Sequence, residues 1–241
     1  MLNCLIRGIS RFHKSLKPYK SVIPVSPTQA ALIITALAPQ DLHKLGSYNG
    51  TVRQGFLGQI AIITAINLLT HGFRSAEVFP KNMGFQRPFT KKEHLALPKI
   101  ADFLFEKKPQ IPFSISSLSN IPQKQAQSLI EIIADDSFSV GFRLREQKTD
   151  HPRHSKFNHR HFMGSAIFCM VCLVARLMLA QIFTSRRPLE SHNPIFVFQR
   201  GKILLPFTYK NFNTIMIRAC KVFGWDIIRT HNFKMGAITY T

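Results

Sequence analysis

The pattern of apolar positions predicts that most of this chain is helical. Stretches that are apolar throughout, or that repeat apolar side chains every three or four residues, are typical of buried or half-buried helices. We expect helices over residues 27–37, 52–70, 165–183 and 208–223, and a further helix that opens near His231.

Short sequence signals mark the ends of these helices. Ser26, Pro27 and Gln29 are typical of a helix start, because serine caps the helix, proline fits its first position and glutamine completes the capping box. Gly72 and Gly224 follow helical stretches, and glycine adopts the left-handed turn that ends a helix without steric cost.

A smaller part of the chain is predicted to form strands and loops. Apolar residues alternate with polar or small ones over 138–145, which predicts a half-buried strand, and a second strand is expected at 195–198. Prolines recur between residues 80 and 121, where we expect loops and a short helix near 95–106. The predicted fold class is α+β, mostly helical, with a small antiparallel sheet.

The chain has a large excess of positive charge. Its 241 residues include 32 lysines and arginines against 12 acidic residues, a formal net charge of +20, while 45% hydrophobic residues and 21 phenylalanines indicate a folded core. Charge of this size repels itself unless a polyanion neutralises it, so nucleic acid or an anionic membrane surface is the expected partner. A small-molecule substrate is not expected.

Two apolar stretches raise the alternative of a membrane protein. Residues 165–183 are long enough to cross a bilayer, but Arg176 lies near their middle, where an arginine costs about 2.5–3.5 kcal/mol on insertion scales. The stretch 55–73 contains Gln59 and Asn67. Both stretches are therefore interpreted as buried core helices, and no membrane partner is expected.

The cysteines give no disulfide or zinc signal. Four cysteines at uneven spacing are too few for a disulfide framework, which favours a reducing compartment. Cys169 and Cys172 lie in an apolar stretch with no second pair of this spacing, so we expect them to pack inside a helix.

Residues 140–162 form a strongly basic part of the chain that also holds four histidines. Histidines at short spacing can bind zinc, but here they alternate with lysine and arginine, whose charges oppose a cation. No metal or other cofactor is therefore expected from His151, His154, His159 and His161. We predict instead that this part contacts DNA phosphates through Arg143, Arg145, Arg153, Lys156 and Arg160.

Three short motifs stand in a fixed order along the chain. They are HGFRSAE at 71–77, KTD at 148–150 and HNFKMGAIT at 231–239. In this order they resemble the catalytic domain of the tyrosine recombinases, in the variant carried by DIRS-type retroelements and related mobile elements. The corresponding boxes of that family read G-(F/L)-L-R-x-x-E, K-T-D and H-S-F-R-R-G-A-x-T.

The resemblance implies the DNA breaking-rejoining fold of these recombinases and a division of the chain. Residues 1–16, which include LIRGISRFHK, resemble the last helix of a truncated N-terminal core-binding domain. Residues 17–26 would be a linker. Residues 27–241 resemble the catalytic domain, although the part from 80 to 137 aligns poorly.

The resemblance also implies a reaction without metal, in which a tyrosine attacks a DNA phosphate and forms a 3′-phosphotyrosyl link. Arg74 would clamp the phosphate, because a guanidinium donates two parallel hydrogen bonds to it. Lys148 would give a proton to the leaving 5′-oxygen. His231 would orient the nucleophile or donate a hydrogen bond to the phosphate.

Two departures from the family pattern concern catalysis. Lys234 stands where the family has an arginine, and lysine keeps the charge but loses the bidentate clamp. The nucleophilic tyrosine of the family lies some tens of residues beyond this box, whereas Tyr240 follows His231 by only about 13.5 Å of helix. We therefore expect the C-terminal tyrosine segment to be missing and the chain to be inactive in cleavage.

The predicted function is DNA binding and, in intact relatives, DNA recombination during integration of a mobile element. Double-stranded DNA is the expected partner, with a homo-oligomer assembled on it. A nuclear location is expected, or a cytoplasmic one in a prokaryote. Two alternatives stay open: a catalytically inactive DNA-binding remnant and a basic membrane-associated protein.

Overall fold

A computed structural model describes residues 23–42, 45, 52–73, 75–79, 97–108, 111–114, 118–143, 157–161, 165–201 and 203–239. These residues form an α+β fold that is mostly helical and has two small antiparallel sheets. The coarse fold class predicted from the sequence is therefore confirmed. The basic helix and the linker expected at the start of the chain fall largely outside the described residues.

The described helices are α2 (Pro27–Leu37), α3 (Phe56–Thr70), α4 (Ser75–Val78), α6 (Pro122–Ala134), α7 (Met170–Ser185), α8 (Tyr209–Phe223) and α9 (Thr230–Thr239). The strands are β1 (Phe103–Lys107), β2 (Ile111–Ser114), β3 (Phe138–Arg143), β4 (Phe157–His161), β5 (Val197–Arg200) and β6 (Ile203–Pro206). A 3-10 helix, η2 (Ile100–Asp102), precedes β1.

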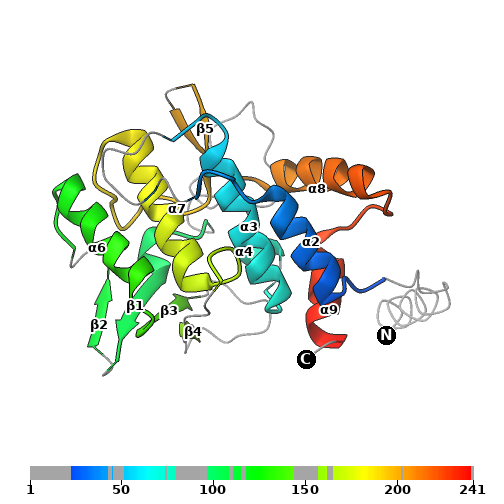
Figure 1. The fold of residues 1–241 in the computed structure, drawn as a ribbon, viewed down its shortest axis with the longest axis horizontal. Helices are drawn as coiled ribbons and strands as arrows, with labels where there is room; N and C mark the ends of the chain where they lie inside the picture. Colours follow the sequence, from blue (N-terminus) through cyan, green and yellow to red (C-terminus); the bar gives the residue numbers. More distant parts are fainter. Residues whose placement is uncertain are drawn as a thin grey trace, which may run out of the picture.

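Helix α3 is the centre of the fold, with α7 on one side and α2 and α9 on the other (Figure 1). Most of its residues are buried because the helix is apolar on all sides. The helix begins at Phe56 and not at residue 52 as expected, since Gly55 adopts a φ of 90°, outside the helical range.

The predicted helix ends are confirmed where the structure describes them. The Ser26 hydroxyl accepts a hydrogen bond from the Gln29 backbone at 3.2 Å, and the Gln29 side chain accepts one from Ser26 N at 3.0 Å. Gly72 and Gly224 have φ angles of 87° and 67°, so both glycines end their helices in the left-handed region.

The buried helix α7 carries polar groups that are satisfied inside the protein. Gln181 is buried and donates to the carbonyl of Ile195 at 2.7 Å. Arg176 donates to the carbonyl of Ala166 at 2.9 Å, and burial lowers the pKa of its guanidinium. Among the described residues, no helix combines the length and apolar character that crossing a bilayer requires.

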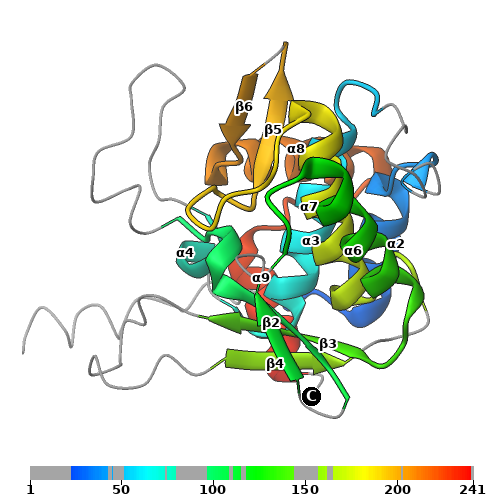
Figure 2. The ribbon, with the colours of Figure 1, turned by 90° about the vertical axis from the view of Figure 1, so that its left-hand side faces the viewer.

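The larger sheet has the strand order β2-β1-β3-β4, with every neighbouring pair antiparallel. Strand β3 was expected to be half-buried, but all residues from Phe138 to Phe142 are buried. The reason is its place in the sheet, between β1 and β4 and against α7. Figure 2 shows this sheet below the helices and the β5–β6 hairpin above them.

The prediction for the proline-rich region was wrong. A short helix was expected near 95–106, but residues Phe103–Lys107 form β1, whose Phe103 and Phe105 are buried on one side of the sheet. Pro112 lies in β2, an edge strand, where a residue without an N–H is tolerated. The part expected as a basic loop contains β4 at Phe157–His161.

Three further elements differ from the expectation. Helix α6 was not predicted, although it begins with Pro122 in its first turn and buries one face against α7. Strand β6 was missed, and β5 lies at Val197–Arg200 where 195–198 was expected. Helix α7 starts at Met170, since the preceding residues 166–168 form a turn.

Candidate functional site

The described part of the chain includes some of the predicted site residues and the flanks of the others. Arg143, Arg160, His231 and Lys234 are described. Outside the described residues lie Arg74, Arg145, Lys148, Arg153 and Lys156. Phe73 and Ser75 flank Arg74, and strands β3 and β4 bound the segment 144–156 that carries the other four.

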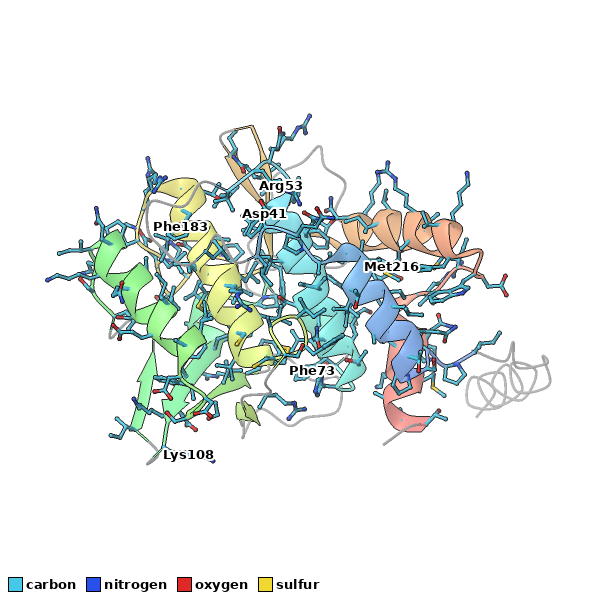
Figure 3. All side chains as sticks on the ribbon, viewed as in Figure 1. Asp41, Arg53, Phe73, Lys108, Phe183 and Met216 are labelled. Carbon is cyan, nitrogen blue, oxygen red and sulfur yellow. The ribbon has the colours of Figure 1, made fainter. Side chains whose placement is uncertain are left out.

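The end of α3 directs the HGFRSAE motif toward β3. Gly72 N donates to the carbonyl of Leu69 at 3.1 Å and Phe73 N to that of Leu68 at 3.3 Å, the bond pattern of a Schellman cap. This turn buries Phe73, whose ring packs edge-on against Phe142 with centroids 5.1 Å apart. Figure 3 labels Phe73 at this end of α3, and Asp41 and Arg53 near the other end of the helix.

His71 lies at the same helix end, near Arg160 of strand β4. Its Nδ1 donates to the carbonyl of Asn67 at 2.6 Å, which leaves Nε2 as the acceptor of a neutral ring. Burial and the nearby positive charge of Arg160 both lower the pKa of His71, outweighing the hydrogen bond to Asn67. Arg160, a predicted DNA contact, therefore lies within electrostatic range of the first motif.

The strand register separates Arg143 and Arg160, the two predicted DNA contacts that the structure describes in the sheet. Arg160 pairs with Val140, so its side chain shares a face with Val140 and Phe142, the face that meets the end of α3. Arg143 pairs with Phe157 and therefore lies on the opposite face, where it is exposed. These two predicted DNA contacts consequently do not share one face.

Helix α9, which carries the third motif, is fixed against the residues that precede α2. The Asn232 carbonyl accepts from Val25 N at 3.1 Å, and the Asn232 amide donates to the carbonyl of Ile23 at 2.8 Å. A side chain at Gly236 would place its Cβ 2.1 Å from the carbonyl oxygen of Val25. The motif therefore needs glycine at position 236, because α9 lies against the backbone of Val25 there.

The same helix also meets the last turn of α3. Asn67 and Thr70 of α3 line a pocket together with Phe233 and Gly236 of α9. A series of aromatic contacts also holds α9 in place. The ring centroid of Phe233 lies 6.3 Å from that of Phe212. Phe212 in turn lies 4.9 Å from Phe79, at the end of α4.

Helix α9 carries a histidine and a lysine near its start. His231 is exposed and Lys234 is half-buried, and the spacing of three residues puts them on adjacent positions of the helix surface. Both lie close to the positive end of the helix dipole. An imidazole and an ammonium in this position can both donate hydrogen bonds to an anion such as phosphate.

A second basic surface was missed in the analysis of the sequence. Helix α8 has no acidic residue and exposes Lys210, Arg218 and Lys221. Spacings of three, eight and eleven residues bring these positions to one side of a helix. The available signal was the basic stripe itself, in a stretch for which the sequence predicts only a helix.

The described residues contain no group of three or more histidine, cysteine or acidic side chains that could hold a metal ion. Cys169 and Cys172 are buried at the start of α7, as expected. Their mutual hydrogen bond, together with burial, raises the pKa of the Cys172 thiol. Cys172 is therefore a packing residue that stays protonated.

The turn after α3 thus contacts strand β3 through Phe73, and the last turn of α3 contacts α9 through the pocket-lining residues. Two of the three sequence motifs, HGFRSAE and HNFKMGAIT, belong to elements that meet there, and the third lies in the segment between β3 and β4.

No family model, curated protein or solved structure matches the chain.

Proposed function

We propose that this protein binds duplex DNA at the surface around the last turn of α3. The observation that carries the proposal is the convergence at that turn of two separate parts of the chain. Phe73 and His71 connect it to the strands that bear Phe142 and Arg160. Asn67 and Thr70 connect it to α9.

The charge of the molecule supports a polyanionic partner. The net charge is +20, and basic side chains are present on β4 and α9, which lie near this turn, and on α8. Lysine and arginine bind the phosphate backbone whatever the base sequence, because they displace condensed counterions. Binding with little sequence preference and a strong dependence on salt is therefore the expected behaviour.

The finer proposal is a catalytic domain of the tyrosine-recombinase kind. Arg74, directly after Phe73, would hold a phosphate through two parallel hydrogen bonds, and Lys148 would protonate the leaving 5′-oxygen from the β3–β4 connection. His231 and Lys234 would donate to the same phosphate from α9. The order of the three motifs supports these roles.

A second candidate is a DNA-binding copy without strand-cleaving activity. Lys234 favours it, because a lysine at this position lacks the planar fork with which arginine holds the charge of the transition state. Loss of one good transition-state donor lowers the rate by about 100- to 1000-fold in enzymes where it has been removed.

DNA binding is tested by fluorescence anisotropy with labelled duplexes of unrelated sequence at increasing KCl. We expect log affinity to fall linearly with log salt, with a slope of about −0.9 for each phosphate neutralised. Vesicles with and without phosphatidylserine serve as the comparison. A flat salt response, or tighter binding to the anionic vesicles than to DNA, would refute the proposal.

Strand cleavage is tested separately, by trapping covalent protein–DNA adducts on a nicked duplex that cannot be religated. An adduct that increases in Lys234→Arg and disappears in Arg74→Ala supports the catalytic role. Absence of adduct in both the wild type and Lys234→Arg, with DNA binding retained, supports the inactive candidate.

A further inference from the structure

A pocket of about 230 Å³ lies between α2, α3 and α9. Small residues create the space: Ala30 and Ala31 of α2 face Gly236 and Ala237 of α9 across it. Gly236 cannot be enlarged, because its neighbour is the backbone of Val25, so α9 lies close to the start of α2 while the pocket stays open beside it.

The walls of the pocket are mainly apolar and include two aromatic rings. Phe233 of α9 is buried, and Phe168, before α7, is half-buried. A cavity of about 150 Å³ with apolar walls is known to hold benzene. The larger volume here suits a flat bicyclic ring, which would contact both aromatic side chains and the small residues between them.

One edge of the pocket is polar and offers hydrogen-bond acceptors. Asn67 is only 4% exposed, and within the described part of the chain both hydrogen bonds of its side chain use Nδ2, to the carbonyls of Ile63 and Ile167. Its Oδ1 is therefore left as an acceptor. The Thr70 hydroxyl gives its proton to the Asn67 carbonyl at 2.8 Å and has lone pairs left to accept.

We propose that this pocket is a binding site for a small planar aromatic molecule, about the size of indole, that carries one N–H or O–H donor. The ring would fill the apolar space and the donor would reach Asn67 Oδ1 or the Thr70 oxygen. This class follows from the walls and the acceptors together, since an apolar ligand without a donor would cover the Asn67 oxygen and leave it unpaired.

The inference is independent of the proposed DNA function. A ligand there would contact both α3 and α9, so it would stabilise the folded protein by mass action. It would also hold together the two helices on which the proposed DNA surface depends.

The experiment is a titration with indole, followed by amide chemical shifts, with indene as the isosteric ligand that lacks the N–H. We expect indole to shift the signals of Gly236 and Ala237 and to bind about 2- to 10-fold more tightly than indene, the value of one neutral hydrogen bond. Thr70→Val should reduce this difference if the hydroxyl accepts.

Variants that fill the pocket complete the test. Ala237→Leu and Ala31→Leu place a larger side chain in it from opposite walls, whereas Ala36→Leu adds the same atoms on the exposed side of α2. We expect either filling variant to abolish indole binding and the control to leave it unchanged. Absence of shifts at Gly236 and Ala237 up to the solubility of indole, or equal binding by Ala237→Leu, Ala31→Leu and Ala36→Leu, would overturn the proposal.

Discussion

The ring of Phe73 packs edge-on against that of Phe142, with centroids 5.1 Å apart and planes inclined by 64°. Phe73 is the residue before Arg74, and Phe142 lies close to the start of the segment that carries Lys148. One aromatic contact thus joins the turn after α3 to strand β3. The relative position of this turn and β3 should depend on the pair.

A double-mutant cycle measures the contact between these rings. Phe73→Leu and Phe142→Leu should each lower the free energy of unfolding, and the double variant should lose less than the sum by about 0.5–1.5 kcal/mol, the value of an aromatic pair beyond its buried area. Urea unfolding of the four proteins gives the coupling. Strict additivity would show that the two rings do not interact.

Gly236 and Gly58 form a matched pair of helical glycines. Gly236→Ala should destabilise the protein by about 1–3 kcal/mol, because its Cβ would meet the Val25 oxygen at 2.1 Å and force α9 outward. Gly58→Ala places its Cβ 3.6 Å from the Phe198 side chain, an ordinary contact. It should raise stability by about 0.5–1 kcal/mol through helix propensity.

The free energy of unfolding of both glycine variants, from thermal or urea unfolding, tests whether α9 packs against Val25. Equal effects of the two substitutions would mean that α9 does not lie against the residues before α2.

The helix signals of the sequence were informative because they act locally. The cap formed by Ser26 and Gln29 and the glycine stops at Gly72 and Gly224 need only neighbouring residues, and all three are present as predicted. Strand β1 was missed for the opposite reason. Its five residues are too short for a clear alternation, and they become a strand by pairing with β3 and β2.

In the candidate site, too, the features set by neighbouring residues could be predicted and those set by tertiary packing could not. His231 and Lys234 could be placed on a helix from the sequence alone, as α9 confirms. The approach of Arg160 to His71 could not be predicted from the sequence. It depends on the register of β4 with β3 and on the packing of β3 against Phe73. The opposite placement of Arg143 and Arg160 depends on the same register.

The lowered pKa of His71 predicts a loss of stability in acid. Its pKa in the folded protein lies below the unfolded value of 6.5, so the unfolded chain binds more protons as the pH falls through that value. Stability should therefore decrease from about pH 7.5 to about pH 5.5. In His71→Gln, which cannot titrate, this decrease should be smaller.

Urea unfolding at the two pH values, for the wild type and His71→Gln, measures the difference. An identical decrease in both proteins would assign the acid sensitivity to other groups and would contradict the placement of the ring near Arg160.

The central claim is that DNA phosphates lie at the surface around the last turn of α3, and matched charge removals test it most directly. Arg160→Gln, Lys234→Gln and Arg187→Gln each remove one positive charge. Arg187 follows α7 at the end remote from this turn, and its side chain is exposed. The three variants therefore have the same net charge and differ in where the charge was lost.

The measurement is the slope of log affinity for duplex DNA against log salt, for the wild type and these three variants, after circular dichroism has confirmed that each is folded. We predict that Arg160→Gln and Lys234→Gln each make the slope shallower by about 0.9, one phosphate contact, and that Arg187→Gln leaves it unchanged. Equal slopes in all four proteins, or a change confined to Arg187→Gln, would contradict the account.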